Sequence, residues 1–70
     1  MSIWPSTRAR IVLKALKKIG WTEAGQVGSH LKLVRPGYAN YIWAFRDSEE
    51  IGPKMLSRIA KHTGLKAEDL

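Results

Sequence analysis

Cysteine is absent from this chain of 70 residues. Its absence excludes a disulfide framework and a thiolate metal site, and it is typical of a reducing compartment, so we expect a cytoplasmic protein. Long hydrophobic runs are absent too, which argues against a membrane-spanning helix. The opening segment Met1–Pro5 lacks the basic start and the apolar stretch of a signal peptide.

Acidic residues are few. Six Asp and Glu stand against twelve Lys and Arg, which gives a formal net charge of +6. The imbalance favours a polyanionic partner such as nucleic acid. A charge of this size also serves to keep a small domain soluble, so charge alone leaves both explanations open.

The chain is short for an enzyme with an enclosed pocket. A domain near this size buries only about 60% of the surface of its unfolded chain, so most large apolar side chains, including most of the Trp residues, are needed for the core. Small-molecule enzymes usually require such a pocket. We therefore expect a site on an open face that acts on a large ligand.

Two segments have the apolar periodicity of helices. The first is capped by Ser6 or Thr7 and runs to about Ile19, before Gly20. The second opens at Gly52-Pro53, because proline suits the first helical position. Their expected buried stripes are Ile11, Ala15, Leu16 and Ile19, and Met55, Leu56, Ile59 and Ala60. The exposed cations of the first helix are Arg8, Arg10, Lys14, Lys17 and Lys18, which either contact phosphate or are simply solvated.

Three strands are expected between the helices, at residues 21–27, 29–35 and 38–45. Gly25-Gln26 weakens the first strand near a bulge, Pro36-Gly37 is a strong turn signal, and the charged residues 46–50 form a loop. The result is a single α+β domain over residues 1–70, ordered α-β-β-β-α. Both helices pack on one face of a three-stranded antiparallel sheet, residues 1–5 are a flexible N-terminus, and residues 66–70 are a C-terminal tail.

The segment Gly28–Arg35 carries a lone histidine on a strand with basic neighbours. Successive strand side chains point to opposite faces, so Leu31 and Leu33 should face the helices while His30 and Lys32 face the open side of the sheet. Imidazole is the one group in the segment that can transfer a proton near neutral pH. The strand alone favours an ordinary exposed histidine, because most exposed histidines do no chemistry.

The sequence of the third strand does not decide which of its two faces points to the core. Tyr41, Trp43 and Phe45 alternate with Ile42 and Ala44. Outward aromatic rings would stack unpaired bases, and inward rings would fill a small core. We expect a mixed arrangement with Trp43 in the core.

Two motifs together resemble the HicA family of toxin ribonucleases: the Gly28-Ser29-His30-Leu31-Lys32-Leu33 turn and strand, and the closing helix Ile51–Leu65 that ends in Gly-Leu. The likeness covers nearly the whole chain. It implies a fold like the double-stranded-RNA-binding domain, cleavage of mRNA, and inhibition by a HicB antitoxin. It also implies that His30 is the catalytic histidine.

The chain departs from the family at one place. Family members commonly carry a Pro-x-His pattern after the third strand, where this chain has Ala44-Phe45-Arg46. Arg46 keeps a cation there but removes a second imidazole. His62 lies near the end of the second helix, where a histidine suits the helix dipole, and we interpret it as structural or solvated.

The resemblance implies metal-independent chemistry without a cofactor, because RNA supplies its own nucleophile in the 2′-OH. His30 would transfer the proton, and the expected RNA- and phosphate-binding residues are Ser29, Lys32, Arg35 and Arg46. The alternative is a non-catalytic RNA-binding module like the double-stranded-RNA-binding domain, which the charge pattern fits equally well.

Overall fold

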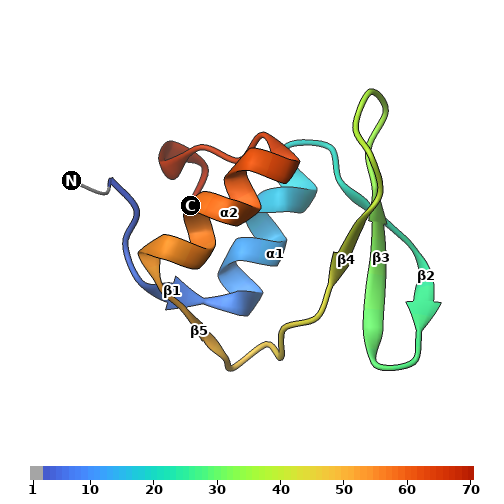
Figure 1. Cartoon of the computed structure of the whole chain (residues 1–70), viewed down its shortest axis with the longest axis horizontal. Helices are drawn as coiled ribbons and strands as arrows, with labels where there is room; N and C mark the ends of the chain where they lie inside the picture. The colour runs from blue at the N-terminus through green and yellow to red at the C-terminus, as the bar shows by residue number, and fades with distance from the viewer. Residues whose placement is uncertain (1–2) are drawn as a thin grey trace.

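The computed structural model describes residues 3–70. Its elements, in chain order, are β1 (Thr7–Arg8), α1 (Ala9–Lys18), β2 (Thr22–Val27), β3 (His30–Val34), β4 (Tyr41–Trp43), β5 (Glu50–Ile51), α2 (Pro53–Thr63) and a short 3₁₀ helix, η1 (Ala67–Asp69). Strands β2, β3 and β4 form an antiparallel sheet in that order, and both helices lie on one side of it (Figure 1). The predicted α+β fold with an α-β-β-β-α core is confirmed.

Helix α1 buries a different stripe from the one expected. The buried positions are Ala9, Val12, Leu13, Ala15 and Leu16. Residues three and four apart share one helical face, so this stripe turns Ile11 outward, where it is 41% exposed. The prediction that Ile11 lies in the core was wrong, while Ala15 and Leu16 were assigned correctly.

The start of α1 is also different, because a small second sheet precedes it. Thr7 pairs with Ile51 and Arg8 with Glu50, so β1 and β5 form an antiparallel pair beneath the helices (Figure 1). No side chain caps the helix; instead Ala9 N–H donates to the Glu49 carbonyl at 2.8 Å and Arg10 N–H to the Asp47 carbonyl at 3.2 Å. The loop satisfies the first helical N–H groups, so the predicted cap at Ser6 or Thr7 is not needed and does not form.

Helix α2 begins and ends where the sequence indicated. Pro53 is its first residue, and Gly64 follows its last with φ 76°, a left-handed conformation that favours glycine. Leu65 then folds back and is only 3% exposed. Leu56 and Ile59 are buried as expected, but Met55 is 37% exposed and was wrongly assigned to the core.

The strands are shorter than predicted, most of all β4, which covers Tyr41–Trp43 instead of residues 38–45. Tyr38 belongs to the turn after β3, where its N–H donates to the Arg35 carbonyl at 3.1 Å, and its ring packs on Trp21 instead of extending a strand. The bulge near Gly25 is confirmed, since the pairing of β2 with β3 shifts between Glu23 and Gln26.

The core lies between the sheet and the helices. Trp21 and Trp43 are 1% and 2% exposed and contact a cluster of aliphatic side chains from β3, β5, α1 and α2. Trp21 Nε1–H donates to the Thr63 carbonyl at 3.0 Å, which connects β2 to the end of α2.

The described residues at both ends of the chain make specific contacts. Residues 67–69 form η1, in which Lys66 N–H donates to the Asp69 carboxylate at 2.8 Å. At the other end, Trp4 packs against the core, and residues 1–2 of the N-terminus expected to be flexible lie outside the described residues.

Candidate functional site

His30 is positioned by a tight turn at the start of β3. Val27 pairs with His30, so only Gly28 and Ser29 connect β2 to β3. Gly28 has φ 65°, and a positive φ at the first of two central residues is the signature of a type II′ hairpin turn. The turn therefore holds His30 at the first paired position of β3, with Ser29 beside it in the exposed turn.

The alternation along β3 is as predicted. Leu33 is fully buried and Leu31 is partly buried against the core, whereas His30 is exposed. His30 and the half-buried Lys32 therefore lie on the opposite side of the sheet from the helices, about 7 Å apart along the strand. We call this side the open face, and it contains His30, Lys32 and the residues of the same parity on β2 and β4.

The register of β4 decides where its aromatic rings lie. Leu31 pairs with Trp43 and Leu33 with Tyr41, so these rings share the core side of the sheet. Phe45 joins them, with its ring centroid 5.0 Å from that of Trp43. Burial raises the pKa of the Tyr41 phenol above 10.0. Trp43 is in the core as predicted, but the mixed arrangement was wrong, because all three aromatics face inward and none of them is a base-stacking platform on the open face.

Two exposed apolar residues on the open face were missed. Val27 lies directly opposite His30 and is 64% exposed, and Ile42 lies opposite Lys32 and is 45% exposed. The sequence of β4 could have revealed the exposed Ile42. Because side chains alternate along a strand, Ile42 must face outward if Tyr41 and Trp43 face the core. The histidine and the lysine thus lie among aliphatic side chains on a flat surface.

Arg46 lies in the loop that follows β4, three residues beyond the end of that strand at Trp43. The β2–β3 turn and the loop after β4 are both at the lower edge of the molecule in Figure 1. Alternation along β4 ends with the strand, and the next loop residue, Asp47, lies at the start of α1, where its carbonyl accepts a hydrogen bond from Arg10 N–H at 3.2 Å. The structure therefore does not place Arg46 on the open face. The carbonyl of Arg46 accepts a hydrogen bond from Glu49 N–H at 3.0 Å, which closes a turn at this place.

Arg35 is not brought together with His30. It follows the last residue of β3, about 17 Å along the chain from His30, and has the parity of the buried Leu33. Its Nη1 donates to the Thr63 carbonyl at 3.3 Å, and its guanidinium carbon lies 4.5 Å from the centroid of the Tyr38 ring. The side chain of Arg35 therefore connects the β3–β4 hairpin to the end of α2.

The candidate site has no acidic neighbour in direct contact. Within residues 3–70 the one ion pair joins Lys17 to Glu23, and nothing in that range forms a hydrogen bond with the His30 ring. Lys32 and Arg46 likewise have no side-chain partner there. The open face can offer the His30 imidazole and the Lys32 ammonium group to an anionic ligand.

Comparison with known protein families matches residues 9–65 to the family described as "HicA toxin of bacterial toxin-antitoxin". The chain belongs to the HicA family. Members of toxin–antitoxin systems act with a partner antitoxin, and the matched range includes His30, Lys32, Arg46 and both helices. No curated protein and no solved structure matches the chain.

The second histidine of this HicA-family chain lies away from the open face. His62 is in the last turn of α2, and its ring stacks on Tyr41 with centroids 5.7 Å apart and 23° between the ring planes. Since Tyr41 faces the helices, this contact is on the covered side of the sheet. It agrees with the interpretation of His62 as a structural residue.

Two features are absent from the part of the chain that the structure describes. No helix among residues 3–70 is long and apolar enough to cross a bilayer. The same residues hold no group of three or more His, Asp or Glu side chains arranged to bind a metal ion.

Proposed function

We propose that this HicA-family toxin is an endoribonuclease that cleaves mRNA with His30 and is neutralised by a HicB-type antitoxin. The observation that carries the proposal is the exposed His30 ring on the open face, on the same side of β3 as Lys32. The flat face suits a large ligand such as an RNA strand, which need not enter a pocket.

The chemistry needs only groups that RNA and this face supply. His30 takes the proton of a ribose 2′-OH, whose oxygen attacks the adjacent phosphorus; the bond from phosphorus to the 5′ oxygen breaks, and that oxygen leaves with a proton from water. Lys32 and Arg46 offset the negative charge that gathers on the phosphate oxygens. The products are a 2′,3′-cyclic phosphate and a 5′-OH. A single general base contributes about 10²- to 10⁴-fold in rate, so cleavage should be modest.

Ser29 and Arg35 have different places in the proposal. Ser29 adjoins His30 in the exposed turn, where its hydroxyl can donate to a phosphate oxygen. Arg35 is already engaged by Thr63 and Tyr38 on the covered side, so we assign it a structural role and omit it from the phosphate-binding set.

One observation favours the rival function, which is RNA binding without cleavage. Activated bases are commonly oriented by a third group, and within residues 3–70 nothing forms a hydrogen bond with His30. In the rival, Lys32 and Arg46 alone would bind phosphates.

Cleavage by His30→Ala, measured beside the wild type, tests the proposal. We expect the variant to lose RNA cleavage and cellular toxicity while its RNA affinity stays within about threefold, because a neutral imidazole adds little to phosphate binding. His62→Ala is the matched control, since it removes the other exposed imidazole from the covered side, and it should cleave like the wild type. A wild type that binds RNA but never cuts it would establish the rival.

A further inference from the structure

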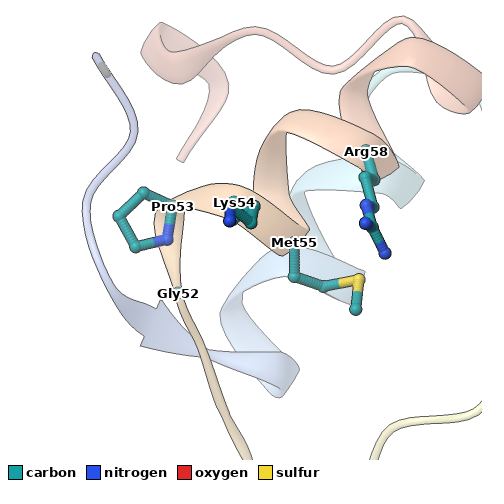
Figure 2. A pocket seen from close by; sticks show the side chains of 5 residues that line it. All are labelled: Gly52, Pro53, Lys54, Met55 and Arg58. Carbon is teal, nitrogen blue, oxygen red and sulfur yellow. The ribbon is translucent and has the colours of Figure 1, made fainter. Parts of the chain in front are cut away.

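A hollow of about 340 Å³ lies at the start of α2, lined by Gly52, Pro53, Lys54, Met55 and Arg58. Met55 and Arg58 extend from the same side of the helix, and Pro53 stands at its first turn (Figure 2). Met55 is 37% exposed although helical periodicity allowed it to be buried. An exposed methionine beside a hollow is a feature of protein-binding surfaces, because its flexible thioether adapts to different apolar partners.

The cations around the hollow have no acidic partner. Helix α2 contains Lys54, Arg58 and Lys61 and no Asp or Glu, and none of the three forms an ion pair within residues 3–70. Their spacing of four and three residues puts them along one exposed side of the helix. A partner that brings carboxylates to this side therefore meets unpaired positive charge.

A second hollow, of about 320 Å³, shows the contrast. It is lined by Arg8, Arg10, Asp47 and Ser48. The lining therefore includes the carboxylate of Asp47, and Arg8 Nη1 already donates to the Ser48 carbonyl at 2.7 Å. This hollow has a carboxylate in its lining, whereas the hollow on α2 has none.

The lining of the α2 hollow favours a protein segment over an RNA strand. Its walls include the Pro53 ring and the Met55 side chain, which offer nothing to a phosphate but pack well against an apolar side chain. Pro53 also removes a backbone N–H from the first helical turn, so this helix end has one donor fewer for an anion. The fitting ligand combines a large apolar side chain with a nearby carboxylate for Lys54 or Arg58.

We propose that the hollow on α2 is a docking site for an acidic, partly apolar segment of the antitoxin. This proposal rests on the proposed function, because it takes the partner to be a HicB-type antitoxin. Since α2 covers the side of the sheet opposite His30, a segment bound in the hollow does not itself cover the open face (Figure 1). The contact that anchors the antitoxin is therefore separate from any contact that prevents RNA cleavage.

The test measures the dissociation constant of the purified complex between this chain and the small antitoxin encoded beside it. Met55→Glu and Arg58→Glu should each weaken the complex by about 10- to 100-fold, as expected for residues at the centre of an interface. The matched controls are Ile11→Glu and Lys14→Glu, which make the same changes at exposed positions of α1 and should stay within about threefold. Met55→Ala serves as a second variant if a charge at this position disturbs folding.

RNA cleavage by the same variants separates this proposal from the proposed function. We expect Met55→Glu and Arg58→Glu to cut RNA like the wild type. The docking proposal is overturned if the wild type does not bind the antitoxin, or if the α2 variants bind it no worse than the α1 controls. It is also overturned if the α2 variants lose RNA binding but still bind the antitoxin. A wild type without cleavage whose complex still depends on Met55 and Arg58 would remove the proposed activity and leave the docking site standing.

Discussion

His30, Lys32 and Arg35 show how differently three basic side chains of one segment are used. The ring of His30 is exposed beside Val27, and Lys32 lies on the same face opposite Ile42. Arg35 turns to the other side and holds the Thr63 carbonyl and the Tyr38 ring. Strand alternation predicted the first two orientations, because the aliphatic residues between them must enter the core. The contacts of Arg35 involve residues up to 28 positions away in the sequence, so alternation did not reveal them.

Substitution of Lys32 and of Arg35 should separate catalysis from stability. Lys32→Ala should lower single-turnover RNA cleavage by about tenfold or more and leave the unfolding midpoint nearly unchanged, because its charge acts on the phosphate. Arg35→Ala should lower the free energy of unfolding by about 1 kcal/mol, since a hydrogen bond and a cation–π contact are lost, and leave cleavage by the folded protein intact. Loss of cleavage in Arg35→Ala without a loss of stability would show that Arg35 belongs to the phosphate-binding residues after all.

At the scale of elements, the end of α2 joins three parts of the fold. Its Thr63 carbonyl accepts hydrogen bonds from Trp21 and Arg35, and Gly64 ends the helix beside Tyr38. The helix was predictable in its bounds, because proline and glycine act locally on the backbone. The pair β1–β5 was not, since strands of two residues show no periodicity and their pairing joins Thr7 to Ile51 across the whole chain.

Gly64→Ala tests this junction. A Cβ on Gly64 would lie 2.6 Å from the Tyr38 hydroxyl oxygen, and φ 76° is already unfavourable for alanine. We expect a loss of about 1–3 kcal/mol in the free energy of unfolding, measured by urea denaturation. Gly37→Ala is the control for strain alone, because Gly37 has φ 85° with nothing within 4 Å of its Cβ position. Equal losses in the two variants would mean that the contact with Tyr38 contributes nothing.

On the scale of the whole molecule, the charge is spread over two sides. The cations of α1 and α2 lie on the helical layer, and His30 lies on the opposite face of the sheet. The helices and the sheet lie side by side along the longest axis of the molecule, so these two sides face away from each other (Figure 1). Under the two proposals, the helical side binds the protein partner and the open face meets RNA.

The salt dependence of RNA binding should report which side RNA occupies. For the non-cleaving His30→Ala protein, the logarithm of the affinity should fall with the logarithm of salt concentration by about 0.7 for each phosphate contact. Adding Lys32→Ala should reduce this slope by about 0.7, and adding Lys61→Ala, on α2, should leave it unchanged. Fluorescence anisotropy with a labelled RNA measures both. A slope that changes with Lys61 and not with Lys32 would place RNA over the helices and would contradict both proposals.

The sequence by itself determined the order of the two α-helices and of the three strands of the main sheet, the turn at Gly28-Ser29, the ends of α2 and the exposure of His30, because each of these follows from residues that are neighbours along the chain. It also carried the membership of the HicA family. Only the tertiary structure decided that Tyr41 and Phe45 face the core, that Arg35 is engaged by Thr63, and that Met55 is exposed beside unpaired cations. These outcomes depend on which surfaces meet, and helix and strand periodicity leaves more than one packing compatible with the same pattern of apolar residues.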